Sequence, residues 1–199
     1  MSHLLSQASK IPSLASRVVM VDSIRSYQDY NLFLKVGMTD HFDTDFVLHI
    51  EPDSAIVDPS AWSDEFFDYD YIGAPWSLSW LETGHDGAKC RDDLVGNSGF
   101  CLMSKRLCEA VKPIYYELPD SQRGKLADKF ICTQIKDRLK EAGMRFAPYE
   151  VANRFSVERA PYDGQFGAHK WIMHNGRRIP PRDFFRRFLQ PQKTTPTNK

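Results

Sequence analysis

Residues 46–54 read Phe-Val-Leu-His-Ile-Glu-Pro-Asp-Ser, an apolar run that stops at two acids flanking a proline. An apolar run of this length predicts a buried strand. Pro52 lacks the backbone donor that strand pairing needs, so we expect the strand to end there. Ligands of open α/β sheets bind at the carboxyl edge of the strands. We therefore expect Glu51 and Asp53 to face a ligand through a divalent cation, with a strand followed by an ordinary polar turn as the open alternative.

Strands and helices are expected to alternate on either side of this segment. The β-branched run at 17–21 predicts a strand, and Ser26 is a favourable cap for a helix that reaches Met38. Further strands are expected at 70–76 and 100–103. This order predicts a single α/β domain with a mixed, mostly parallel sheet flanked by helices.

The most regular helical pattern covers residues 126–142. Its predicted buried stripe consists of Phe130, Ile131, Ile135 and Leu139. Residues 179–189 predict a basic amphipathic helix near the end of the domain. Within one domain over 1–199, we expect residues 1–16 to form an N-terminal arm and residues 190–199 to form a disordered tail.

Composition narrows the class of protein. The chain has 199 residues, of which 42% are hydrophobic and 26% charged, as expected of one soluble domain. Twenty-six basic residues balance twenty-six acidic ones, so no overall field attracts nucleic acid or an anionic membrane. The four cysteines form no C-x-x-C pair, which is compatible with a reducing cytoplasm. The chain lacks an apolar run of about 20 residues and the apolar core of a signal peptide. We therefore expect a cytoplasmic protein with no membrane span and no nucleic-acid partner.

Several segments, in this order, resemble GT-A-fold glycosyltransferases, and most closely a poorly characterised glycosyltransferase-like family of bacteria, algae and large algal viruses. They are F-V-L-H-I-E-P-D-S at 46–54, W-S-D-E-F-F-D-Y-D-Y-I-G-A-P-W at 62–76, V-G-N-S-G-F-C-L-M-S at 95–104, a helix that opens near Asp128, and F-G-A-H at 166–169. The resemblance spans residues 17–171. It implies a single GT-A-like, Rossmann-like domain. It also implies an enzyme that moves a hexosyl or deoxyhexosyl group from a nucleotide-diphospho-sugar to a glycan hydroxyl.

The resemblance implies a metal site. In GT-A enzymes an acid-x-acid motif ends the strand beside the nucleotide and holds Mn²⁺ or Mg²⁺ on the diphosphate, and Glu51-Pro52-Asp53 occupies that place. The first acid departs from the usual Asp, so we expect Asp53 to bind the metal directly and Glu51 to act indirectly or through water. His169 matches a late histidine ligand, although a lone histidine is more often structural. A mixed set of oxygen and nitrogen ligands favours Mn²⁺ over Mg²⁺.

The donor half of the resemblance is shorter than usual. GT-A domains place two strand–helix units before the acid-x-acid strand, and only the unit at 17–38 precedes it here. Within that unit we expect Asp22 to contact ribose or base and Arg25 to pair with phosphate, beside Glu51 and Asp53. The short half implies a minimal donor pocket or a trimmed chain. It leaves open a non-catalytic relative that binds a nucleotide sugar or a glycan.

Two aspartates compete as the general base that takes the acceptor proton. Asp128 matches the base of inverting family members, and a carboxylate in this role is worth about 10²–10⁴ in rate. A position at a helix start keeps Asp128 ionised but makes it a weaker base, so it is alternatively a helix stabiliser. Asp93, in the loop before Gly96, is the competitor.

The acceptor side of the resemblance falls on Gly96, Asn97 and Ser98. Gly96 allows close backbone approach to a sugar, and Asn97 and Ser98 offer hydrogen bonds to hydroxyls, whereas the alternative is an ordinary tight turn. Trp76 is expected either to stack on the acceptor sugar or to pack in the core. A third hypothesis uses the same acids for metal-dependent phosphoryl transfer or hydrolysis. Neither a P-loop nor a dense carboxylate cluster supports it.

Overall fold

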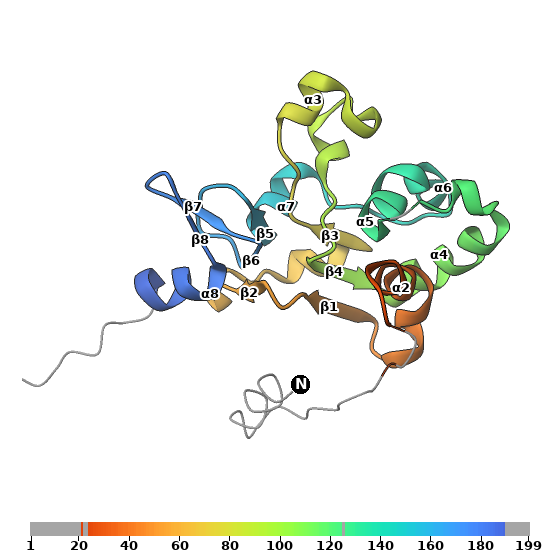
Figure 1. The fold of residues 1–199 in the computed structure, drawn as a ribbon, viewed down its shortest axis with the longest axis horizontal. Helices are drawn as coiled ribbons and strands as arrows, with labels where there is room; N and C mark the ends of the chain where they lie inside the picture. The colour runs from red at the N-terminus through yellow and green to blue at the C-terminus, as the bar shows by residue number, and fades with distance from the viewer. Residues whose placement is uncertain (1–20, 22–23, 125, 190–199) are drawn as a thin grey trace, which may run out of the picture.

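The computed structural model describes residues 21, 24–124 and 126–189 (Figure 1). The strand expected at 17–21 falls almost entirely outside these residues, as do Asp22, the N-terminal arm and the C-terminal tail. The described part is a mixed α/β structure, as the sequence predicts. None of its helices is both long and apolar enough to cross a bilayer.

The first sheet is built around a strand that is buried on both faces. It has the order β1 (Phe46–Ile50), β4 (Phe100–Ser104), β3 (Tyr71–Gly73), and both ladders are antiparallel. All five residues of β4 are buried. Side chains of β4 alternate between two apolar clusters, with Cys101 and Met103 in one and Phe100 and Leu102 in the other. This explains why the sequence of β4 is a continuous apolar run.

The second sheet continues from the first through a three-residue link. It has the order β2 (Ser54–Ile56), β6 (Gly167–His169), β5 (Ser156–Glu158), with β2 antiparallel and β5 parallel to β6. A separate hairpin of β7 (Ile172–His174) and β8 (Arg177–Ile179) follows. The hairpin turns at Asn175-Gly176, where both residues have the positive φ that a tight two-residue turn requires.

The predicted mostly parallel sheet is wrong for the described strands, because β5–β6 is their one parallel ladder. Parallel neighbours need a crossover element packed on the sheet. The segment that joins β3 to β4 contains the five-residue α3 (Ser79–Thr83) and two short 3₁₀ turns, and α3 projects away from the sheet (Figure 1). Without a crossover, β4 returns antiparallel to β3.

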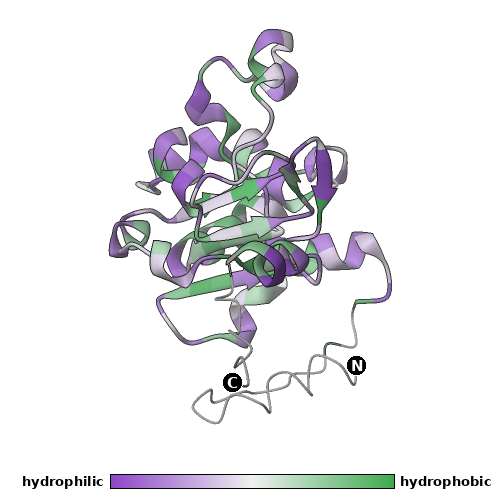
Figure 2. Ribbon diagram, turned by 90° about the vertical axis from the view of Figure 1, so that its left-hand side faces the viewer, coloured by the Kyte–Doolittle hydropathy of each residue, from purple (hydrophilic) through white to green (hydrophobic). Residues whose placement is uncertain are grey.

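Helices cover both faces of the first sheet (Figures 1 and 2). The elements α2, α4, α5 and α6 pack on the cluster that contains Cys101, and α7 packs on the cluster that contains Phe100. Their bounds are α2 (Tyr27–Leu32), α4 (Lys105–Glu117), α5 (Ala127–Lys129), α6 (Lys136–Glu141), α7 (Tyr149–Phe155) and α8 (Pro181–Phe184). Single π-type turns occupy Phe33–Gly37, Phe130–Gln134 and Phe185–Leu189. Short 3₁₀ turns occupy Met38–His41, Pro59–Ala61, Asp64–Asp68, His85–Gly87, Arg91–Leu94 and Asp120–Gln122.

The two main helix predictions are confirmed in outline. Ser26 caps α2 by accepting a hydrogen bond from the Asp29 amide at 3.1 Å. The predicted helix at 126–142 is helical but breaks at Ile135, between a π turn and α6. Its predicted apolar stripe is buried. Turns of π type are rare and occur often at functional sites.

Candidate metal centre and its cavity

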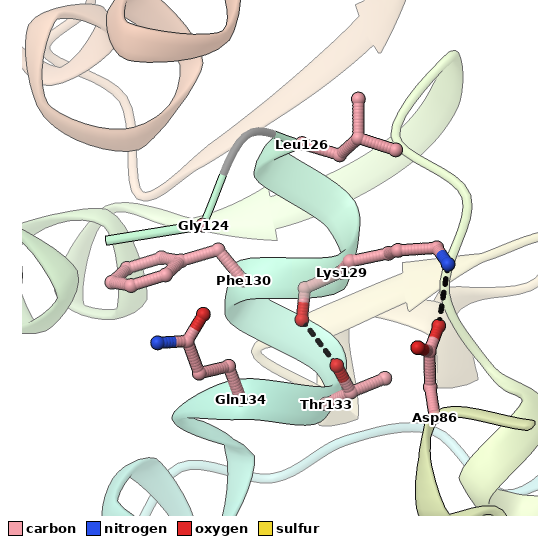
Figure 3. A pocket seen from close by; sticks show the side chains of 7 residues that line it. All are labelled: Asp86, Gly124, Leu126, Lys129, Phe130, Thr133 and Gln134. Atoms are coloured by element: carbon pink, nitrogen blue, oxygen red, sulfur yellow. Dashed lines mark hydrogen bonds and ion pairs between the residues drawn. The ribbon is translucent and has the colours of Figure 1, made fainter. Parts of the chain in front are cut away.

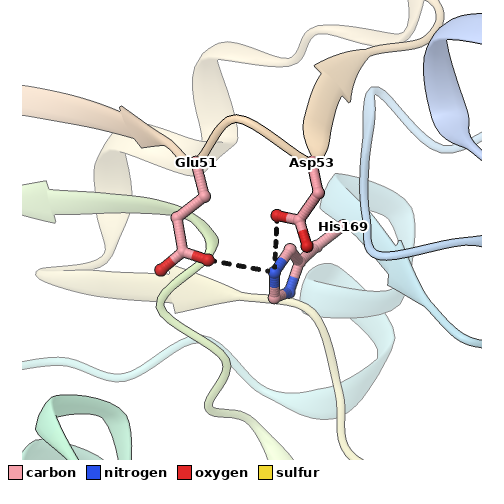
Figure 4. Close-up of side chains that lie close together, drawn as sticks. All are labelled: Glu51, Asp53 and His169. Atoms are coloured by element: carbon pink, nitrogen blue, oxygen red, sulfur yellow. Dashed lines mark ion pairs between the residues drawn. The ribbon is translucent and has the colours of Figure 1, made fainter. Parts of the chain in front are cut away.

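The two acids lie where the first sheet passes into the second. The Glu51 amide donates to the carbonyl of Gly99 at 2.8 Å, and the Ser54 amide donates to the carbonyl of Glu51 at 2.9 Å. The Ser54 hydroxyl donates to the same Gly99 carbonyl at 2.7 Å. These bonds fold residues 51–54 into a turn, and the carboxylates of Glu51 and Asp53 point to one side of it (Figure 4).

His169 brings a nitrogen to both carboxylates. It ends β6, paired in register with Ser54, so the ring lies beside the turn. Its Nε2 is 3.2 Å from Glu51 Oε2 and 3.3 Å from Asp53 Oδ1 (Figure 4). One ligand atom from each residue lies within 4.8 Å of the others. The prediction that these three residues form one site therefore agrees with their placement.

The His169 ring carries an observation that favours a cation. The residue is 5% exposed, yet neither ring nitrogen makes a hydrogen bond of acceptable geometry within the described residues. A buried polar atom without a partner is costly, and native proteins seldom leave one. A divalent ion with oxygen and nitrogen ligands would satisfy Nε2 and both carboxylates together. The residues present therefore fit a divalent metal.

The expected difference between the two acids is not supported. Glu51 lies as close to His169 Nε2 as Asp53 does, and it accepts a hydrogen bond from the Tyr30 hydroxyl at 2.8 Å. The neighbouring His169 ring, with the Tyr30 bond, lowers the pKa of Glu51 to about 2 against the opposing effect of burial. Asp53 is exposed, and its Oδ2 is 3.1 Å from Lys170 Nζ. Glu51 is therefore the more firmly held carboxylate and an equal candidate ligand.

A further carboxylate, which the sequence did not single out, faces the other side of the ring. Glu158 Oε1 is 3.5 Å from His169 Nδ1, and Glu158 Oε2 accepts from Asn97 Nδ2 at 2.5 Å. Burial raises the pKa of Glu158. Histidines that bind metals commonly direct their second nitrogen to a carboxylate, which fixes the ring. The available signal was weaker than for Glu51, because the strand that Glu158 ends is only Ser156–Glu158 and contains a single apolar residue.

The glycines of the two specific motifs allow these strands to meet. A Cβ placed on Gly99 would lie 2.3 Å from the His169 ring, and one placed on Gly167 would lie 2.1 Å from the Phe100 ring. Both distances are too short for any side chain, so larger residues at either position would displace the His169 ring or Phe100. The G-N-S-G-F and F-G-A-H segments are thus in direct contact.

Asp128 faces the same cavity as the acid–histidine cluster. The cavity encloses about 160 Å³, and its lining includes Glu51, His169, Asp128, Asn97 and Ser98. Burial is the main cause that raises the pKa of Asp128. The helix start acts on Asp128 in the opposite direction, because the Lys129 amide donates to Asp128 Oδ1 at 2.8 Å, but burial has the larger effect on its pKa. A carboxyl with a raised pKa is better suited to accept a proton.

Two cations also line this cavity in unusual backbone conformations. Arg159 and Lys170 have φ of +57° and +66°, and Asn97 has +47°. Three of the five non-glycine residues with positive φ in the described chain thus border one cavity. Such conformations cost free energy and concentrate at functional sites.

Other residues predicted for the site do not line this cavity, namely Asp93, Trp76, Gly96 and Arg25. Asp93 accepts from the amides of Lys89 and Cys90 at 2.9 and 3.1 Å, so it closes a turn instead of lining the cavity. The Trp76 ring packs against Trp80 at 4.9 Å, and a Cβ on Gly96 would lie 2.1 Å from it. The absence of a side chain at Gly96 therefore leaves room for the indole, which is 9% exposed and packs against Trp80. Arg25 is exposed, and its backbone amide bonds Asp29.

Two larger cavities adjoin the site. One encloses about 390 Å³, and its lining includes Trp76, Trp80, Tyr149, Glu158 and Arg159. It shares Arg159 with the cavity of about 160 Å³. Another of about 640 Å³ shares Leu126 with it (Figure 3). In this largest cavity the one carboxylate, Asp86, is paired with Lys129 at 2.6 Å. Glu51, His169 and Asp128 thus line the small cavity, and the two neighbouring cavities add about 390 and 640 Å³ beside it.

Residues 13–170, more than three quarters of the chain, match the profile of a family described as "Protein of unknown function (DUF5672)". Comparison with curated proteins and with solved structures found no match.

Proposed function

This chain belongs to the family described as "Protein of unknown function (DUF5672)", and from the geometry of its cavity we propose that it is a metal-dependent glycosyltransferase. The proposed reaction moves a sugar from a nucleotide-diphospho-sugar to a glycan hydroxyl with inversion. The proposal includes a GT-A-like arrangement of the site and action in the cytoplasm. All four cysteines are free thiols, which supports the proposed action in the cytoplasm.

The observation that carries the proposal is the cluster of Glu51, Asp53 and His169, of which Glu51 and His169 line one cavity with Asp128. Two carboxylates and an unpartnered buried imidazole would hold Mn²⁺ or Mg²⁺. When bound, the ion would neutralise the donor diphosphate and assist its departure as a Lewis acid. Lys170 and Arg159 line the same cavity and add positive charge where phosphates would lie.

Asp128 is assigned to the acceptor. Its half-buried carboxyl lines the cavity and has a raised pKa, so it can accept the proton that a sugar hydroxyl loses as it attacks. Transfer with inversion is a direct displacement that needs one base for the attacking hydroxyl, and Asp128 is proposed as that base. The 160 Å³ cavity is smaller than the 300–1,000 Å³ typical of ligand pockets. We therefore place the reacting ends of both substrates there and the remainder of the sugars in the adjoining 390 Å³ cavity.

A thermal-shift panel of nucleoside diphosphates and their sugar conjugates, with and without Mn²⁺, tests this proposal. We expect stabilisation that requires both the metal and the diphosphate, and that is lost in Asp53→Asn. Asp43→Asn is the matched control, because Asp43 is exposed and outside the cavity. No Mn²⁺-dependent stabilisation by any diphosphate would contradict the proposal.

The same ligands then separate the alternatives in a turnover assay. Binding without sugar transfer to any glycan acceptor would indicate a non-catalytic relative, which the short donor half of the resemblance leaves open. Donor hydrolysis that is independent of acceptor would favour a hydrolytic enzyme. Acceptor-dependent transfer that requires Asp128 would support the proposed reaction.

A further inference from the structure

One end of the molecule carries a concentration of arginines that the proposed reaction does not use. Between Trp171 and Phe188 the chain has five arginines and one acid, Asp183, although charges balance over the whole chain. The arginines are Arg177 and Arg178 on β8 and Arg182, Arg186 and Arg187 on α8 and the turn after it. We call these five residues the arginine surface.

The arginine surface is exposed and lacks partner carboxylates. All five residues are exposed, and none forms a salt bridge with any acid in the part of the chain that the structure describes. Arg178 lies over the Trp171 ring at 4.7 Å, which holds its guanidinium in place. The β7–β8 hairpin and α8 stand at one end of the molecule, opposite α4 and α6 (Figure 1).

A cavity opens within this surface. It encloses about 430 Å³, and its lining includes Arg177, Arg178, Arg187, Asn175 and Phe188. Guanidinium groups bind phosphate oxygens in a planar, bidentate manner. Three arginines and an amide around one compact hollow fit a single phosphate-bearing group better than an extended polyanion.

Phe188 indicates where that group comes from. The residue is 47% exposed at the rim of the cavity, and its ring lies 4.4 Å from the ring of His174. The preceding Phe184 is buried in the core of the second sheet, so the helix is fixed to the domain and presents its arginines outward. An exposed aromatic ring among arginines matches the boundary between lipid headgroups and acyl chains.

We propose that the arginine surface docks the protein on an anionic lipid membrane, with a headgroup phosphate in the cavity lined by Arg177, Arg178 and Arg187. The association is peripheral and electrostatic, and it weakens as ionic strength rises. The surface follows directly on His169, Lys170 and Trp171 in the chain, so docking would hold the metal cavity near the membrane. The inference depends on the arginine surface alone and stands apart from the proposed transferase activity.

Sedimentation of the full chain with vesicles tests this inference. We expect binding to vesicles that contain one-third phosphatidylserine in phosphatidylcholine, and no binding to phosphatidylcholine alone. Each basic residue at an anionic surface strengthens association about fivefold, so Arg177→Glu with Arg187→Glu should weaken partitioning more than about tenfold. Phe188→Ser should weaken it severalfold and leave its salt dependence unchanged.

The control is Lys89→Glu with Lys140→Glu, which changes net charge equally at exposed residues elsewhere. We expect this variant to bind the vesicles as the unchanged chain does, and circular dichroism to show that all variants are folded. Three results would overturn the inference: an equal loss in the control, equal binding to neutral vesicles, or tighter binding of duplex or single-stranded nucleic acid through the same arginines. Stabilisation by inorganic phosphate without vesicle binding would assign the cavity to a free anion and overturn it as well.

Discussion

At the scale of single residues, Asp128 and His169 face one cavity but their surroundings suit them to opposite tasks. Burial raises the pKa of Asp128, so its carboxyl gains from accepting a proton. His169 has Nε2 between two carboxylates and Nδ1 opposite Glu158. This arrangement suits an imidazole that binds a cation. In the proposed reaction, Asp128 would accept the proton and His169 would bind the metal ion.

Asp128→Asn should raise stability while it removes activity. Because burial raises the folded-state pKa of Asp128, the protonated form stabilises the fold at low pH, and this contribution is lost as pH rises through the folded-state pKa. At neutral pH the buried charge is a cost, which asparagine removes. We expect a melting temperature higher by about 2–4 °C at neutral pH, as for about 1 kcal/mol in a domain of this size. The difference should vanish near pH 3, and transfer should fall about 10²–10⁴-fold.

Melting in EDTA across pH measures this effect without a contribution from metal. Asp137→Asn is the matched control, since Asp137 is an exposed acid on α6. We expect no change in its melting temperature at any pH. A lower melting temperature of Asp128→Asn at neutral pH would show that the carboxylate makes stabilising contacts and is a structural group.

The sequence alone located the cluster but not the residues that support it. The acid pair was identifiable because an apolar run ends on it, whereas His169 and Asp128 were predicted only through the resemblance to GT-A enzymes. Glu158 was missed because its role depends on β5 lying parallel to β6, a pairing that no local pattern encodes. The two expectations for Trp76, a sugar platform or a core residue, could not be separated from the sequence, because only the packed structure shows Gly96 and Trp80 against its ring.

At the scale of secondary structure elements, Asp70 joins the first sheet to its helices. It is 3% exposed, and its carboxylate accepts from the Arg106 guanidinium, from the Ser104 hydroxyl at 2.5 Å and from the Arg145 amide at 2.8 Å. These partners belong to the start of α4, the end of β4 and the segment after α6. One side chain therefore fixes where three elements meet.

Asp70→Asn should destabilise the fold by about 2–3 kcal/mol, because a neutral amide leaves Arg106 and the Ser104 hydroxyl poorly paired. The hydrogen bonds of Asp70, together with Arg106, lower its pKa against the opposing effect of burial. Its stabilisation is therefore present above the unfolded-state pKa near 4 and is lost as pH falls through the folded-state value. In urea unfolding, the variant should lose much free energy of unfolding relative to the unchanged chain at pH 7. The loss should be smaller at pH 3.

The control for Asp70 is Asp40→Asn. Asp40 is exposed and lies 3.5 Å from Lys112, a surface pair worth less than about 1 kcal/mol. A destabilisation by Asp70→Asn no larger than that of Asp40→Asn would show that the buried network contributes little.

Elements with a strong local pattern were predictable, and their pairing was not. The strands at 46–50 and 100–104 follow from apolar runs, and the stripe of the helix at 126–142 follows from its period. The break at Ile135 is set by tertiary packing around the π turn. Strand direction was predicted incorrectly because alternation of strands and helices suggests crossovers, whereas the long connection between β3 and β4 lies away from the sheet.

At the scale of the whole molecule, the candidate metal site connects parts that otherwise have separate cores. Glu51 follows β1 of the first sheet, Asp53 precedes β2 of the second, and His169 ends β6, the central strand of the second. The second sheet has its own apolar cluster around Val57, Val157 and Phe184. A metal ion held by residues from both sheets would therefore stabilise the position of one sheet relative to the other. In turn, the packing of the two sheets would favour binding of the ion.

Mn²⁺ alone should raise the melting temperature and protect both sheets. At one hundred times the dissociation constant, a ligand specific for the folded state adds about 2.7 kcal/mol. In a domain of this size that corresponds to about 5–10 °C, reversed by EDTA. Hydrogen exchange should slow at the turn 51–54 and at 167–169 together, because the proposed ligands lie in both segments.

Variants of His169 and of Glu158, which faces its second ring nitrogen, test whether the ion couples the two sheets through the His169 ring. His169→Ala should abolish the shift. Glu158→Gln should weaken Mn²⁺ binding by about 10–100-fold, because it removes the carboxylate opposite Nδ1 and leaves Nε2 in place. Glu150→Gln, an exposed acid on α7, should leave it unchanged. If the Mn²⁺ shift persists in His169→Ala, or if protection is confined to one sheet, the ion binds elsewhere and the site does not join the two sheets.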